Sequence, residues 1–290
     1  MVISGGEFYL KFGLSFTYNG FSTIDKNLIL CADSGADSIS LLPDREMVMG
    51  NTNYLRNETF GVSSKYSDVL SLEIMLIKDP QIYDCQHVQA FTRSELREIT
   101  SWLTSPNIPM LLEFEDYEEN DDGIPVDFFG NFTNVTSFTA GNLYGIKATF
   151  QCNAPWGYTK EQIYSSTISG SGNLTINNTS DDWESSVYPY IILSDTQNET
   201  VVIENKTDNG KFSLKTERNI DAYIDCRRLM VQKPIENGYD LVRFSDLGWT
   251  TDTLDTLYWP RLVYGRNELS ITGNCKVTIK CRYPRKVGEL

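Results

Sequence analysis

The chain has 290 residues, and because domains usually run to about 100–150 residues, this length predicts two domains. Hydrophobic residues make up 40% and charged residues 22%, the ordinary balance of a globular protein. The formal net charge of −14 argues against sequence-independent binding to a phosphate backbone. Such acidity would let DNA slide past the protein; the alternative is that it only keeps the protein in solution.

Neither a secretory signal nor a membrane segment is expected. Residues 1–12 lack a basic stretch followed by an apolar core. The longest apolar run, Val69–Ile77, is interrupted by Ser71 and Glu73 and is too short to span a bilayer. Six cysteines are scattered without a Cys-x-x-Cys pair, so we expect them to be reduced and mostly buried: Cys31, Cys85, Cys152, Cys226, Cys275 and Cys281.

The first half predicts strands around one helix. Leu14, Phe16 and Tyr18 alternate with polar residues, which is typical of a half-buried strand, and Asn19-Gly20 ends it. Val69–Ile77 predicts a second strand, closed by Pro80.

A helix start is encoded by Thr92-Arg93-Ser94-Glu95, the pattern of a capping box. The apolar residues that follow recur on one helical face, and Ser105-Pro106 ends the helix; these residues are Leu96, Ile99, Trp102 and Leu103. Met110–Phe114 then predicts a strand.

Two more strands are predicted before the composition changes. Asn131–Thr139 alternates imperfectly, whereas Tyr144–Cys152 alternates without a break and predicts a strand with one buried face. We expect strand edges within 143–152 to be open to pairing with another subunit. At Asn153–Gly157 proline and glycine end the pattern, and Ser, Thr, Asn and Gly become frequent. We therefore predict two domains, 1–153 and 154–290.

The second half predicts many short strands, which is typical of a β-sandwich. Alternating runs include Leu174/Ile176, Tyr188–Leu193, Val201–Ile203 and Phe212/Leu214. A final hairpin is predicted, with Gly273-Asn274 as its turn.

No catalytic, cofactor or metal site is expected. The single histidine, His87, falls in a polar connector, and no Gly-x-Ser-x-Gly elbow or phosphate-binding glycine loop is present. One histidine and dispersed cysteines do not supply a zinc site. The carboxylates are densest at a strand end and the following turn, where like charges favour a solvated loop; an ion site and a channel wall are alternatives. They are Glu113, Glu115, Asp116, Glu118, Glu119, Asp121 and Asp122.

A sugar-binding reading rests on four tryptophans, whose rings could stack on saccharides: Trp156, Trp183, Trp249 and Trp259. The competing reading is that these side chains pack partly buried, as tryptophan usually does.

The C-terminal stretch contains Trp259-x-x-Leu262-x-x-Gly265-x-Asn267, and a strand with a basic, tyrosine-containing end follows. This aromatic-x-x-Leu-x-x-Gly-x-Asn segment and its strand resemble the ending of the distal tail proteins (Dit family) of long-tailed, non-contractile phages. Similar anchors are Phe16–Gly20, Ala154–Tyr158 and Ile220–Asp225. The segment 44–67 does not align beyond an expected loop or β-arm.

The resemblance implies a tail-tube-like split β-barrel with one helix, followed by a galectin-like β-sandwich. It implies a hexameric ring that joins the tail tube to the tip or baseplate, with a channel for the tape-measure protein and DNA. Partners would be further copies, the tube protein, tail-tip proteins and receptor-binding proteins. The protein would be assembled in the host cytoplasm and reside in the virion tail.

Two alternatives are kept: a carbohydrate-binding adhesin or receptor-binding subunit, and an enzyme such as a glycoside hydrolase. For the ring, the acidic residues Glu113, Glu115, Asp116, Glu118 and Glu119 are candidates for the channel side. Late basic residues are candidates for an interface, the alternative being a solvated face: Arg261, Arg266, Arg282, Arg285 and Lys286.

Overall fold

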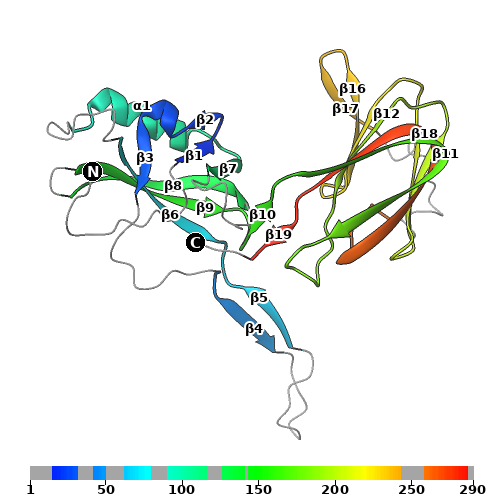
Figure 1. The fold of residues 1–290 in the computed structure, drawn as a ribbon, viewed down its shortest axis with the longest axis horizontal. Helices are drawn as coiled ribbons and strands as arrows, with labels where there is room; N and C mark the ends of the chain where they lie inside the picture. Colours follow the sequence, from blue (N-terminus) through cyan, green and yellow to red (C-terminus); the bar gives the residue numbers. More distant parts are fainter. Residues whose placement is uncertain are drawn as a thin grey trace, which may run out of the picture. The chain divides into compact units, whose positions relative to one another are not determined.

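The computed structural model describes residues 15–31, 42–49, 62–79, 90–115, 126–140, 143–242 and 258–286. These residues form two compact units (Figure 1). The first runs as far as Tyr158 and resumes at Arg285, and the second is Thr159–Pro284.

The first unit is built on a curled antiparallel sheet in the order β2-β1-β7-β8-β9-β6-β3. Its strands are β1 (Ser15–Tyr18), β2 (Phe21–Ser22), β3 (Leu28–Cys31), β6 (Ser71–Lys78), β7 (Met110–Glu115), β8 (Val126–Ala140) and β9 (Leu143–Cys152). A 3₁₀ turn, η1 (Ile24–Lys26), joins β2 to β3, and β10 (Gly157–Thr159) pairs with β8 and with β19 (Pro284–Arg285).

The expectation of an open edge at 143–152 is wrong. β9 matches the predicted strand closely, but it is paired with β8 on one side and with β6 on the other. Its buried face alternates as predicted, yet alternation along a strand carries no information about how many neighbours that strand has. Within the described residues, the strands at the ends of the sheet order are β2 and β3.

The helix α1 (Arg93–Thr104) covers one face of this sheet (Figure 1). The predicted capping box is confirmed: the Glu95 amide donates to Thr92 Oγ1 at 3.2 Å, and the Thr92 amide donates to the Glu95 carboxylate at 2.6 Å. Trp102 stacks on Phe16 with ring centroids 5.7 Å apart, and its indole N–H donates to the Tyr18 carbonyl at 2.8 Å. Burying each such large side chain stabilises the fold by about 1.5–3 kcal/mol.

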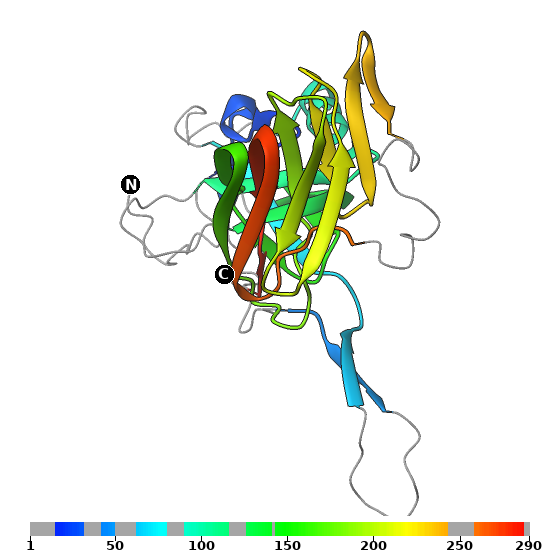
Figure 2. The ribbon, with the colours of Figure 1, turned by 90° about the vertical axis from the view of Figure 1, so that its right-hand side faces the viewer.

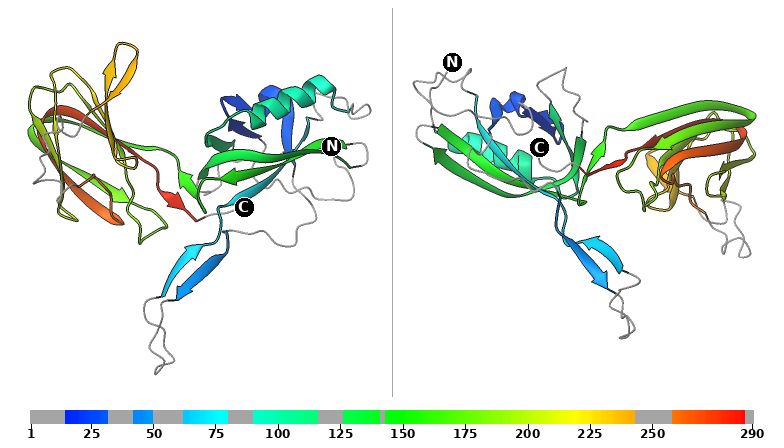
Figure 3. Two further views of the ribbon diagram at one scale, coloured as in Figure 1. Left: turned by 180° about the vertical axis from the view of Figure 1, so that it is seen from behind. Right: turned by 60° about the horizontal axis from the view of Figure 1, so that its bottom comes forward.

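A separate two-stranded sheet is formed by β4 (Arg45–Met49) and β5 (Val62–Tyr66). Both views of Figure 3 show it projecting from the larger sheet of the first unit. At its base, the ring of Tyr66 packs edge-on against Trp156 with centroids 5.7 Å apart. The described part of segment 44–67 therefore contains a β-hairpin arm, in line with the expected loop or arm.

The second unit is a β-sandwich, as predicted, in the strand order β14-β13-β18-β12-β15-β16-β17 with β11 paired to β18 (Figure 2). Its strands are β11 (Gln162–Asn178), β12 (Tyr190–Ser194), β13 (Thr200–Asn205), β14 (Gly210–Lys215), β15 (Ala222–Asp225), β16 (Met230–Ile235), β17 (Gly238–Leu241) and β18 (Gly265–Cys281). One core joins the two layers, with Ile191 and Ile224 from one and Ile203 and Phe212 from the other.

The predicted hairpin at Gly273-Asn274 is wrong. Residues 265–281 form one 17-residue strand, β18, that pairs with β11 in unbroken register. Its first half pairs with β13 and its second half with β12, so the strand passes from one layer to the other. Gly273 and its register partner Gly170 have φ values of +131° and +78°, which glycine alone adopts readily. The two glycines therefore make a bend within a ribbon and not a chain reversal.

Candidate functional site

The motif that carries the family resemblance forms a segment that runs into the start of β18, and we call this segment the latch (258–267). Trp259 is buried and packs on Phe212 with ring centroids 5.4 Å apart. Leu262 is buried, and its backbone exchanges hydrogen bonds with Val187 at 2.8 and 2.9 Å. Gly265 has a φ of +82°, which turns the chain into β18. Each fixed position of the motif thus has a structural task.

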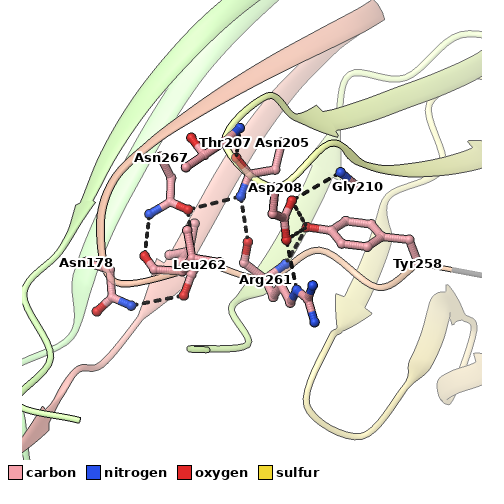
Figure 4. Close-up of polar contacts among 10 residues, drawn as sticks. Asn178, Asn205, Thr207, Asp208, Gly210, Tyr258, Arg261, Leu262 and Asn267 are labelled. Carbon is pink, nitrogen blue, oxygen red and sulfur yellow. Dashed lines mark hydrogen bonds and ion pairs between the residues drawn. The ribbon is translucent and has the colours of Figure 1, made fainter. Parts of the chain in front are cut away.

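Asn267 satisfies its whole side-chain amide inside the protein (Figure 4). It donates to the carbonyls of Val263 and Gly265 at 2.8 and 2.9 Å, and it accepts from the Val263 amide at 2.9 Å and from Asn205 Nδ2 at 3.0 Å. Asn205 Nδ2 also donates to the Arg261 carbonyl at 2.9 Å. Buried polar groups that are fully paired in this way specify one backbone conformation.

A second set of hydrogen bonds joins the latch to Asp208, which lies in the loop before β14. Its carboxylate accepts from Tyr258 Oη at 3.1 and 3.2 Å and from Arg261 Nε at 2.8 Å (Figure 4). Burial, and then the adjacent Asp208 charge, raise the pKa of Tyr258 to about 12. The hydrogen bond to Asp208 raises the pKa of Arg261. Tyr258 therefore stays protonated and Arg261 charged, as hydrogen-bond donors that hold the latch to the loop before β14.

Three of the predicted basic residues have different partners in the structure. Arg261 pairs with Asp208, Arg266 forms an exposed ion pair with Glu268 at 2.9 Å, and Arg282 Nη1 donates to the Thr159 carbonyl at 3.2 Å. Arg266 lies at the start of β18, whereas Arg282 follows its end. These residues are close in the sequence, but the 17-residue strand β18 separates Arg266 from Arg282.

The predicted acidic residues fall partly outside the described chain, since Asp116, Glu118 and Glu119 lie between the described ranges. Glu113 and Glu115 lie on β7, on the face opposite to the buried Leu112. The Glu115 carboxylate accepts from Ser15 Oγ and, at 3.3 Å, from Thr17 Oγ1. Glu113 stands opposite Asp127 of β8 in the register, so three carboxylates share this side of the sheet.

The structure offers little reactive chemistry in its described part. No group of three His, Cys, Asp or Glu residues there could hold a metal ion. Four described cysteines are buried free thiols: Cys152, Cys226, Cys275 and Cys281. Burial raises the pKa of Cys152 to about 12. The single histidine, His87, lies outside the described ranges.

No helix among the described residues has the length and apolarity that crossing a bilayer requires.

Of the tryptophans considered for sugar stacking, Trp259 is buried in the core and Trp156 packs against Tyr66. Trp183 is 71% exposed and lies beside Tyr264, with ring centroids 5.8 Å apart. Trp249 lies outside the described residues. Sequence reasoning missed the tyrosines on the outer face of β12, β15 and β17, because strand register decides which of them meet.

Fold and site together define a class: a two-domain, β-rich structural protein whose most fully hydrogen-bonded polar side chains hold loops in place. Residues 12–154 match a family described as the phage tail protein N-terminal domain, and residues 156–281 match its phage tail C-terminal domain. The chain therefore belongs to this family of phage tail proteins, which are structural proteins and not enzymes.

A solved structure agrees over nearly the whole chain. The Dit protein of phage SPP1, titled a paradigm of the hub adsorption apparatus in phages that infect Gram-positive bacteria, matches with a TM-score of 0.58 and 14% identity. The match covers 93% of this chain and 99% of the other. The expected resemblance to distal tail proteins is thus confirmed for the fold. No curated protein sequence matches this chain.

Proposed function

We propose that this protein is a distal tail protein: a hub subunit that closes into a ring of six and joins the tail tube to the tail tip or baseplate. The observation that carries the proposal is the shared two-domain fold with the SPP1 hub protein over 93% of the chain, together with membership of a phage tail family. Such a ring needs one heterologous interface that is repeated around an axis.

In this proposal residues 1–153 form the ring and residues 154–290 form a galectin-like sandwich that offers surface to other tail proteins. β2 and β3, at the ends of the sheet order, are the candidate edges for pairing between subunits, in place of β9. The β4–β5 arm is a further candidate, because an isolated two-stranded hairpin is marginally stable in water and gains from being covered.

We place an acidic surface on the channel side of the ring, where like charge would keep passing DNA and tape-measure protein from sticking. Its candidates are Glu113, Glu115, Asp116, Glu118 and Glu119. Arg266 and Arg282 are candidates for contacts with neighbouring tail proteins; Arg261 is assigned to the latch because it pairs with Asp208. Partners would be the tube protein, tip proteins and receptor-binding proteins, with assembly in the host cytoplasm.

Native mass measurement tests the ring directly. One chain has a mass of 33.0 kDa, so six should give a species of about 198 kDa, six times that value. Mass photometry of the purified protein, alone and with the tube and tip proteins added, should show this species. Monomers under both conditions would contradict the proposal.

A further inference from the structure

One outer face of the second unit carries aromatic and polar side chains that neither the core nor the latch uses. β12, β15, β16 and β17 are consecutive in the sheet, and β16 and β17 form the gold hairpin at its edge in Figure 2. Their inward residues, such as Ile191, Ile224 and Val231, are buried in the core. Because side chains alternate along a strand, the intervening residues point outwards.

The strand register places these outward residues side by side. Tyr223 of β15 stands opposite Gln232 of β16, which stands opposite Leu241 of β17. In the neighbouring row, Tyr190 of β12 stands opposite Asp225 of β15. Directly opposed residues share a face, so these positions form one surface. We call it the tyrosine face: Tyr190, Tyr223, Asp225, Gln232, Tyr239 and Leu241.

The tyrosine rings lie close enough to form a continuous platform. The ring centroids of Tyr190 and Tyr223 are 6.5 Å apart, and those of Tyr223 and Tyr239 are 5.3 Å apart at nearly right angles. Tyr239 is 61% exposed and Leu241 is 56% exposed. Exposed apolar and aromatic groups gathered at one place mark binding surfaces, whereas single exposed residues carry no such meaning.

The polar groups between the rings decide which kind of partner fits. Asp225 accepts from the Arg228 amide at 2.9 Å, and its carboxylate lies 3.8 Å from Nε of the exposed Arg228 side chain. Within the described part of the chain, the Gln232 side chain and the Tyr239 hydroxyl have no hydrogen-bond partner. A protein interface has a desolvated centre from which charges are depleted. Here the Gln232 amide lies among the rings, so covering the face with an apolar protein surface would bury that amide unpaired and would also desolvate the Asp225–Arg228 ion pair.

A saccharide can pack on the aromatic rings and also form hydrogen bonds with the polar groups between them. Its C–H faces pack on aromatic rings, and its hydroxyls donate to carboxylates and pair with amides. The local charges fit a neutral sugar, because the cations beside the face already lie next to carboxylates: Arg228 is 3.8 Å from Asp225, and Lys280, opposite Tyr190 in the register, is 3.5 Å from Glu161. We propose that the tyrosine face binds a neutral oligosaccharide of a bacterial cell wall, with the tyrosine rings as the stacking platform and Asp225 and Gln232 as hydrogen-bonding groups.

The test is binding of the full chain to an array of neutral bacterial cell-wall oligosaccharides, with phosphate-bearing ones alongside, followed by titration of the strongest hit. Neutral sugars should bind, and Tyr239→Ala and Gln232→Ala should each weaken binding about tenfold, about 1.4 kcal/mol. Trp183→Ala is the matched control, because it removes an exposed aromatic ring of the same unit from outside this face.

Three results would overturn the proposal: no neutral sugar bound at millimolar concentration, binding that survives both face variants, or binding that Trp183→Ala removes. A preference for the phosphate-bearing sugars would also contradict it. Circular dichroism of each variant shows whether it is folded. The same samples are used for the mass measurement, so loss of sugar binding and loss of the ring are scored separately.

Discussion

Glu95 performs two tasks at the start of α1. It completes the capping box with Thr92, and its carboxylate pairs with Lys78 of β6 at 2.9 and 3.0 Å. The Lys78 side chain is 4% exposed, so this ion pair lies where water cannot replace the carboxylate easily. Removing one partner of such a buried pair is costly, whereas exposed ion pairs contribute little.

We expect Glu95→Gln to lower the stability of α1 by about 1–3 kcal/mol, because the amide keeps the cap but removes the charge beside Lys78. Glu98→Gln is the control on the same helix, since Glu98 is 63% exposed in its pair with Lys26, and it should cost less than about 0.5 kcal/mol. Hydrogen exchange of the α1 amides in increasing urea measures the stability of the helix in both variants. Equal losses of stability would contradict a special contribution of the Glu95–Lys78 pair.

The same pair predicts a pH dependence. Burial alone would raise the pKa of Glu95, but hydrogen bonds from Lys78 and Thr92 outweigh it and the pKa is lowered. A lowered folded pKa means that the stabilisation is complete above the unfolded value, about 4.3, and is lost as the pH falls through the folded value. The stability difference between wild type and Glu95→Gln should therefore be constant above about pH 5 and shrink as the pH falls below that value.

At the scale of elements, β18 is the strand on which the sandwich depends, because it pairs with β11 throughout and with β12 and β13 in turn. Its bend at Gly273 allows one strand to serve both layers. Asn274 fixes this bend by accepting from the Gly170 amide at 3.0 Å and by donating to Glu199 from its side chain at 3.2 Å.

Gly273→Ala should destabilise the second unit by about 2–3 kcal/mol, since its φ of +131° is strained for any other residue and the added methyl would lie 3.0 Å from Val201. Gly172→Ala is the control on β11. There the backbone is ordinary and the methyl meets only the flexible end of Ile168, so the loss should stay below about 1 kcal/mol. Urea unfolding measures the free energy of unfolding of both variants. A larger loss of stability for Gly172→Ala than for Gly273→Ala would contradict the importance of the bend.

Local signals were predictable from sequence, and long-range pairings were not. The capping box fixed the start of α1, and strict alternation fixed β9, because both patterns depend on neighbours within a few residues. Gly273-Asn274 has the composition of a hairpin turn, but a partner strand about 100 residues away keeps the chain extended there. The latch shows the same difference. Gly265 and Asn267 belong to a motif that can be recognised in the sequence, whereas their long-range partners Asn205 and Asp208 could not be predicted from it.

At the scale of the whole molecule, the acidic charge bears on the proposed channel. Glu113→Lys with Glu115→Lys should make the assembled protein bind single-stranded DNA, because it replaces two carboxylates of the proposed wall by ammonium groups. Glu204→Lys with Glu268→Lys changes the net charge equally on the second unit and should not. Fluorescence anisotropy at about 50 mM and 200 mM salt measures binding. Equal DNA binding by both double variants would contradict the proposal that Glu113 and Glu115 line the channel.

We propose that this protein acts by closing into a ring around a passage. Cryo-electron microscopy of the purified protein, alone and mixed with its tail tube protein, tests this most directly. We expect rings with sixfold symmetry and a central channel, with Glu113 and Glu115 facing that channel. Open filaments, or a closed assembly without a channel, would contradict it.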